Sequence, residues 1–181
     1  MGFYIRTMMA VLFAAGSAHV WAGDKGVGQT FYTQHSFYYE KGRYITTNYA
    51  RGGVVPINSM VKIVDIGRKS IELELKGGTP VDVVNVVNVK KYTQKDIKDI
   101  QALLLGERPV SLDGYNEEIQ KAIKDGVLKV GMKKSAVLFA RGYPPAHATP
   151  SLDSDKWIYW QSRYNRVELI FDNDRIIQIR E

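Results

Sequence analysis

Residues 60–77 read Met60-Val-Lys-Ile-Val-Asp-Ile-Gly-Arg-Lys-Ser-Ile-Glu-Leu-Glu-Leu-Lys-Gly77, and this stretch indicates the fold of the N-terminal half. Apolar and polar residues alternate in its second part, which places Ile71, Leu73 and Leu75 on one face of a strand and two glutamates on the other. The segment Gly67-Arg-Lys-Ser70 has turn composition and separates this strand from the one before it. The pattern therefore predicts two half-buried strands with a short turn between them.

Similar short runs lie on both sides of this pair. A β-branched and aromatic run at 43–49 precedes the turn residues Gly52 and Gly53, and a valine-rich run at 81–89 follows a second Gly-Pro turn. Four or five short strands at this spacing are typical of a small barrel or sandwich. We expect a small antiparallel β-barrel over residues 23–92.

The composition changes to a helical pattern at Thr93. Thr93-Gln-Lys-Asp96 has the composition of a helix start, and apolar residues then recur at helical spacing as far as Gly106. Residues 93–115 are therefore expected to form a helix and a linker. Two more helices are predicted at 116–125 and 134–141, and the last should stop at Gly142-Tyr-Pro-Pro145 because proline cannot continue it.

Three strands are predicted after the helices, at 157–162, 167–172 and 175–180. Asn173-Asp174 between the last two is a hairpin turn signal. The order of strands, then helices, then strands indicates the α+β class. We therefore expect two or three helices packed on a three-stranded antiparallel sheet, with the C-terminal domain at 116–181.

The first 22 residues have the pattern of a cleavable signal peptide. One cation, Arg6, precedes an apolar run of about nine residues, and the small residues Val20 and Ala22 stand at the −3 and −1 positions of a cleavage site. A membrane-spanning helix needs roughly 20 apolar residues, so an uncleaved anchor is the weaker interpretation. We expect cleavage after Ala22, no transmembrane segment in the remaining chain, and a periplasmic or secreted protein.

Composition restricts the chemistry and the partners. The chain has no cysteine, which excludes disulfides, zinc-thiolate sites and cysteine nucleophiles. Removal of Arg6 with the signal peptide lowers the formal net charge from +6 to +5. A basic exported protein favours anionic neighbours such as lipid head groups or acidic glycans, and nucleic acid is not expected in that compartment.

The C-terminal segments Val127-Leu-Lys-Val-Gly-Met132, Gly142-Tyr-Pro144, Trp157-Ile-Tyr159 and Val167-Glu-Leu-Ile-Phe171 occur in an order that resembles the SmpA/OmlA (BamE-like) domain. The likeness covers about residues 117–180. It implies two helices on a three-stranded antiparallel sheet and a noncatalytic scaffold role in the cell envelope. This chain has no lipid-bearing cysteine, a departure from the BamE pattern. Residues 31–90 more loosely resemble a bacterial Src-homology-type small barrel, a class that often binds peptide or cell-wall material.

No catalytic, cofactor or metal residues are predicted. His35 and His147 follow the expected signal peptide, and neither has a second histidine at metal-ligand spacing. Glu72 and Glu74 fit a solvated strand face, and the acid pairs at 153/155 and 172/174 fit turn chemistry better than a calcium loop. We do not expect an enzyme; a hydrolase that pairs a histidine with an acid is kept as an alternative.

Aromatic and arginine residues near the C-terminus are the candidate partner-binding site. Trp157 and Tyr159 share one face of a strand, and Trp160 points to the other face, where it either reaches solvent or packs under the N-terminal barrel. Tryptophan, tyrosine and arginine are enriched in interfaces. We expect an envelope or extracellular protein to contact Tyr143, Pro144, Pro145, Trp160, Arg163, Tyr164 and Arg166. The alternative is that the barrel and basic turns bind cell wall or an anionic glycolipid surface.

Overall fold

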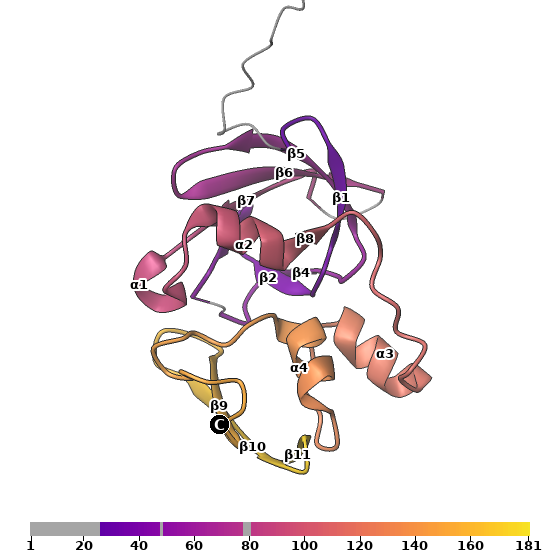
Figure 1. Cartoon of the computed structure of the whole chain (residues 1–181), viewed down its shortest axis with the longest axis vertical. Helices are drawn as coiled ribbons and strands as arrows, with labels where there is room; N and C mark the ends of the chain where they lie inside the picture. The colour runs from indigo at the N-terminus through magenta and orange to yellow at the C-terminus, as the bar shows by residue number, and fades with distance from the viewer. Residues whose placement is uncertain (1–25, 48, 78–80) are drawn as a thin grey trace, which may run out of the picture.

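The computed structural model describes residues 26–47, 49–77 and 81–181 (Figure 1). Within this part of the chain the protein is α+β: a six-stranded sheet curls into half a barrel, four short helices follow, and a three-stranded antiparallel sheet completes the chain. The signal peptide expected at residues 1–22 lies outside the described residues. No helix in the described part is both long and apolar enough to cross a membrane.

The curled sheet has the strand order β3-β7-β6-β5-β1-β8. Its strands are β1 (Thr30–Thr33), β3 (Arg43–Ile45), β5 (Met60–Ile66), β6 (Ser70–Lys76), β7 (Val83–Val87) and β8 (Leu105–Gly106). A separate two-stranded ribbon contains β2 (Phe37–Tyr39) and β4 (Gly53–Val55). The predicted turn at 67–70 joins β5 and β6 as an antiparallel hairpin. Ile71 and Leu73 of β6 are fully buried, which confirms the predicted alternation.

The sheet differs in two ways from the antiparallel barrel expected at residues 23–92. It remains open, with β3 and β8 at its edges. Its β3 also pairs in parallel with β7, Arg43 opposite Asn85. The strands on either side of β3 in the sequence, β2 and β4, pair with each other in the separate ribbon. β3 therefore pairs with neither of them and lies at the sheet edge beside β7, a strand much later in the chain.

Helix α2 (Ile97–Leu104) packs on the curled sheet and buries Ile97, Ile100 and Leu104 in the first core. Its N-cap is Asp96, whose carboxylate accepts hydrogen bonds from the backbone N–H groups of Lys98 and Asp99 at 3.0 and 3.2 Å. The predicted start at Thr93 is therefore wrong by three residues. Residues Lys90–Thr93 form a separate turn, α1, which ends at Gln94 in a left-handed conformation (φ 58°).

The C-terminal part contains α3 (Glu117–Lys124), α4 (Lys134–Arg141), β9 (Lys156–Trp160), β10 (Arg166–Asp172) and β11 (Arg175–Arg180). The sheet order is β11-β10-β9, and both strand pairs are antiparallel, as predicted. Asn173 and Asp174 have positive φ in the β10–β11 turn. The helices and the sheet enclose a second core of buried apolar residues that includes Ile123, Met132, Val137, Trp157, Tyr159, Leu169, Phe171 and Ile176.

Ser36 lies where the two parts of the protein meet. Its backbone N–H donates to the Phe139 carbonyl at 2.8 Å, and its hydroxyl donates to the Ile123 carbonyl at 2.7 Å and accepts from the Ile57 N–H at 2.8 Å. The Ile57 side chain is itself buried in the second core. The ribbon around β2 and β4 is therefore held directly against α3 and α4, and we call this junction the seam.

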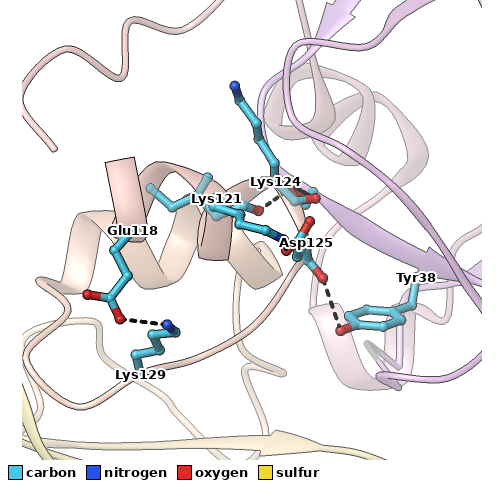
Figure 2. A network of polar contacts seen from close by, with 8 residues as sticks. Tyr38, Glu118, Lys121, Lys124, Asp125 and Lys129 are labelled. Carbon is cyan, nitrogen blue, oxygen red and sulfur yellow. Dashed lines mark hydrogen bonds and ion pairs between the residues drawn. The ribbon is translucent and has the colours of Figure 1, made fainter. Parts of the chain in front are cut away.

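Figure 2 shows the solvent side of the seam at the end of α3. The Tyr38 hydroxyl reaches the carbonyls of Asp125 and Gly126 at 3.5 and 3.2 Å. Gly126 follows the helix with φ +71°, and a side chain there would meet the Tyr38 ring. Ion pairs such as Lys129–Glu118, at 2.7 Å, lie on exposed surface beside this contact. The ion pairs add little to stability because water screens them, whereas the tyrosine fixes the end of α3.

Candidate functional site

A cleft of about 380 Å³ opens along the seam, and we call it the seam cleft. One wall comes from the N-terminal part, namely His35, Tyr44, Thr46, Thr93, Gln94, Lys95, Ile100, Leu103 and Leu104. The other comes from the loop after α4, namely Tyr143, Pro144, Pro145, Ala146, Thr149, Pro150 and Leu152. The lining combines aromatic, aliphatic and proline side chains with one histidine, three threonines, one glutamine and one lysine, and it has no carboxylate. Such a lining suits an apolar group of a ligand or partner.

The loop wall after α4 owes its shape to a glycine and two prolines that are recognisable in the sequence. α4 ends at Gly142, whose N–H donates to the Leu138 carbonyl at 2.7 Å and whose φ is +69°. Pro144 and Pro145 are buried behind it, and the Pro145 carbonyl accepts from the N–H groups of Ala148 and Thr149, both at 3.0 Å. Prolines and closed turns leave little conformational freedom to lose on binding. The wall is therefore preorganised.

Tyr143, Pro150 and Leu152 are the exposed apolar residues of this wall. Tyr143 is 41% exposed and Leu152 is 37% exposed, while Pro144 and Pro145 are buried. The loop is also fastened to the N-terminal part, because the Ala146 N–H donates to the Tyr92 carbonyl at 3.0 Å. An incoming group would therefore meet an aromatic ring, an aliphatic side chain and the Pro150 ring on a fixed support.

His35 lies in the lining of the seam cleft and is only 6% exposed. Its Nδ1 lies 3.1 Å from the Ser36 carbonyl oxygen, and its ring sits against Gly142. Burial lowers the pKa of His35 from 6.5 to about 4, and the hydrogen bond to the Ser36 carbonyl only partly opposes this effect. The ring is therefore neutral at pH 7.

Arg141 carries a positive charge under the seam. It is 5% exposed, and its guanidinium carbon lies 5.4 Å from the ring centroids of both Tyr38 and Tyr159. Burial lowers the pKa of Arg141, and the surrounding tyrosines oppose that shift. The Tyr159 hydroxyl donates to the Gly142 carbonyl at 2.8 Å. This cation and these rings hold the end of α4 in place and lie beneath the site.

A second hollow of about 360 Å³ also uses residues from both parts, and we call it the aromatic pocket. Its lining is Thr47, Tyr49, Tyr92, His147, Trp160 and Arg163. The rings of Tyr92 and His147 are tilted against each other with centroids 4.9 Å apart. The Ala50 N–H donates to the Trp160 carbonyl at 3.1 Å, which joins the loop after β3 to the end of β9. Four rings and one guanidinium therefore surround one hollow.

The predicted partner-binding residues separate into three places. Tyr143, Pro144 and Pro145 line the seam cleft, and Trp160 and Arg163 line the aromatic pocket. Tyr164, which is 82% exposed, and Arg166 are absent from both linings. Arg166 forms an ion pair with Glu168 at 2.9 Å. Trp160 itself is half-buried and forms a bridge with Tyr49, so it packs against the N-terminal part at one edge.

The residues that the N-terminal half contributes to the two hollows were not predicted from the sequence. Tyr44, Leu103, Tyr49 and Tyr92 line the two hollows, but each first appears in the chain as a strand, helix or turn residue. These residues come close to residues 143–163 through contacts across the seam, and such long-range contacts cannot be predicted from local sequence periodicity. The pairs Arg43-Tyr44 and Lys91-Tyr92 are local signals of an aromatic residue beside basic charge.

The other candidate polar groups lie elsewhere. Glu74 is paired with Lys76, whose hydrogen bond lowers the pKa of that carboxylate. Asp153 accepts from Ser151 in an exposed turn, as the turn interpretation predicts. Among residues 26–47, 49–77 and 81–181, no group of three His, Cys, Asp or Glu side chains is placed to hold a metal ion.

No protein-family model, curated protein or solved structure matches this chain.

Proposed function

We propose that this protein is a noncatalytic exported envelope protein that acts as a binding scaffold, and that its partner is another envelope or extracellular protein. The observation that carries the proposal is the seam cleft, a hollow lined by apolar and polar side chains, with a rigid Tyr-Pro-Pro wall contributed by one part and a helix-and-strand wall contributed by the other. Interfaces concentrate binding energy in a few aromatic or apolar side chains that fill such pockets.

The size and the charge of the cleft indicate what it accepts. Its volume of about 380 Å³ is near the lower end of the roughly 300–1,000 Å³ typical of ligand pockets, so it suits one or two side chains of a partner. Lys95 is the charged side chain in the lining, and the whole chain carries a formal charge of +6. We therefore propose that an apolar anchor residue enters the cleft from a segment whose other residues are neutral or acidic.

The state of the two histidines supports binding over acid–base catalysis. A catalytic imidazole needs a pKa near the working pH and a polar partner that holds its tautomer. His35 is buried, its pKa is lowered to about 4, and its ring nitrogen faces the carbonyl of its own neighbour. The His147 ring lies tilted against that of Tyr92 in the aromatic pocket, where no carboxylate lines the hollow.

The family resemblance and the compartment belong to the same proposal. Two helices followed by a three-stranded antiparallel meander at residues 117–180 is the arrangement that an SmpA/OmlA-like domain requires, which supports that assignment. We propose export through a signal peptide cleaved after Ala22, to the periplasm or beyond it. A scaffold role, as in this domain family, is consistent with a site that is suited to binding and not to catalysis.

Photocrosslinking in the cells that make the protein tests the proposal. Tyr143 is replaced by the photoreactive amino acid benzoylphenylalanine, which keeps a ring at the accessible edge of the cleft. We expect irradiation to give a discrete adduct with an envelope or extracellular protein, identified by mass spectrometry.

Two variants that each introduce an arginine, one inside and one outside the seam cleft, are compared for adduct formation. Leu152→Arg places a charge in the cleft at an already exposed position and should abolish the adduct. Ile177→Arg makes the same chemical change at a residue that is 56% exposed on β11 and outside the cleft, and should leave the adduct intact. An adduct of equal intensity in both variants, or no adduct from the protein whose one change is benzoylphenylalanine at position 143, would refute the proposed site.

A further inference from the structure

We propose that the aromatic pocket binds a carboxylated sugar unit of an acidic glycan. This inference concerns a different hollow from the seam cleft and does not depend on the proposed function. It starts from the residue types that the fold gathers there: Tyr49 and Thr47 from the loop after β3, Tyr92 from α1, His147 from the loop after α4, and Trp160 with Arg163 at the end of β9.

The rings supply a surface for the apolar face of a sugar. A pyranose ring presents C–H groups on its faces and hydroxyl groups around its edge, so it packs against aromatic rings while its edge forms hydrogen bonds. Tyr49, Tyr92 and Trp160 are each half-buried, which keeps the rings fixed while part of each remains accessible. Tyrosine and tryptophan combine an apolar body with a polar group in the same way as the sugar does.

The charge of the pocket selects an anion. Arg163 is exposed and is the permanent charge in the lining, which has no carboxylate. Lys91 adds a second cation nearby, with its ammonium nitrogen 5.8 Å from the centroid of the Tyr92 ring. A guanidinium forms two parallel hydrogen bonds with a carboxylate, and this geometry recognises that group specifically.

Two polar atoms in the lining have no hydrogen-bond partner among the described residues. They are the Thr47 hydroxyl oxygen and the Trp160 indole nitrogen, and both are shielded from solvent. A buried polar group without a partner is destabilising, because it has lost its hydrogen bonds to water and gained none in the protein. Hydroxyl groups of a sugar can supply both missing partners, the acceptor for the indole N–H and either role for the threonine, after small side-chain rotations.

The same features disfavour other small ligands. A phosphate group usually requires several N–H donors from a helix start or a backbone nest, whereas here a single guanidinium lines the hollow. A cationic ligand would face Arg163 and Lys91. A neutral sugar would leave the guanidinium without a specific partner. A sugar acid matches the rings, the hydroxyl partners and the cation together.

Titrations monitored by nuclear magnetic resonance test this inference on the intact protein. The reporter is the indole N–H signal of Trp160, assigned by its loss in Trp160→Phe. We expect glucuronic acid to shift this signal saturably, and glucose and acetate to bind at least about tenfold more weakly because each lacks half of the recognised group. Inorganic phosphate, the fourth probe, should not shift the signal saturably.

Two variants that each remove one arginine distinguish specific recognition by Arg163 from a general effect of positive charge on binding. Arg163→Gln should weaken glucuronic acid binding about tenfold, because hydrogen bonds to charged groups are the stronger ones. Arg108→Gln removes the same charge at an exposed residue outside the pocket and should leave the affinity unchanged. The inference is overturned if glucuronic acid causes no saturable shift, if glucose, acetate or phosphate binds as well as glucuronic acid, or if the two variants bind it equally.

Discussion

Protonation of His35 should weaken the fold between pH 7 and pH 4. The pKa is about 4 in the folded protein against 6.5 for an unfolded chain, so the unfolded state takes up a proton first as the pH falls. The contribution of His35 to the free energy of unfolding is therefore highest above pH 6.5, declines through the interval, and levels off below pH 4. The cause is the burial of the ring under Gly142, where an imidazolium would lose its hydration.

The linkage relation gives the size of the effect. With these two pKa values the His35 contribution at pH 5 is about 2 kcal/mol lower than at pH 7, and at pH 4 it is about 3 kcal/mol lower. For a domain stabilised by roughly 5–15 kcal/mol this is a substantial fraction of the total. The loss should appear first at the seam, since the imidazole touches residues from both parts.

Urea unfolding at pH 7, 6, 5 and 4 measures the effect when the protein is compared with His35→Leu. Carboxylates elsewhere titrate in both proteins, so the difference between the two pH profiles isolates the imidazole. We expect His35→Leu to lose about 2 kcal/mol less than the parent protein between pH 7 and pH 5. Parallel profiles over the whole range would show that His35 is not buried as a neutral ring, and the reasoning would fail.

Two substitutions, one just after α4 and one on β9, test the packing of the seam. Gly142→Ala should destabilise the protein more than Gly131→Ala in thermal unfolding: both glycines have positive φ, but an added Cβ at position 142 lies 2.6 Å from the His35 ring, whereas at 131 nothing lies within 4 Å. Equal losses would mean that backbone strain, and not the ring contact, requires the glycine. Tyr159→Phe should cost about 1–3 kcal/mol, because the buried Gly142 carbonyl loses its hydroxyl donor, and an unchanged urea midpoint would contradict that hydrogen bond.

Local elements of this fold could be predicted where short-range rules act without competition. The helix at 134–141 was predicted with the bounds it has, because Gly142 and two prolines stop it. The start of α2 was misplaced because threonine and aspartate are both favoured at the N-cap position, so the sequence offers Thr93 and Asp96 as possible starts. The structure uses Asp96 with Asp99 in a reciprocal capping box, and the Thr93 hydroxyl bonds to Asn88 instead.

The candidate sites were only half predictable for a different reason. Tyr143–Pro145 carried a local signal because the turn and the aromatic residue stand together in the sequence. The opposite walls did not, because Tyr44 and Leu103 approach residue 143 only after two separate sequence regions have packed. The parallel pairing of β3 with β7 is the same kind of long-range contact, and alternation within either strand carries no information about its direction.

The hydrogen bonds of Ser36 have a consequence for how this molecule comes apart. One small side chain and its amide connect three distant stretches of backbone, and separating them would strand buried donors and acceptors in a place that water does not reach. The barrel-like portion and the helix–meander portion should consequently melt in one cooperative transition, so that calorimetry records a single heat-absorption peak. Evolution can alter either surface, but it cannot easily exchange one portion for an unrelated module.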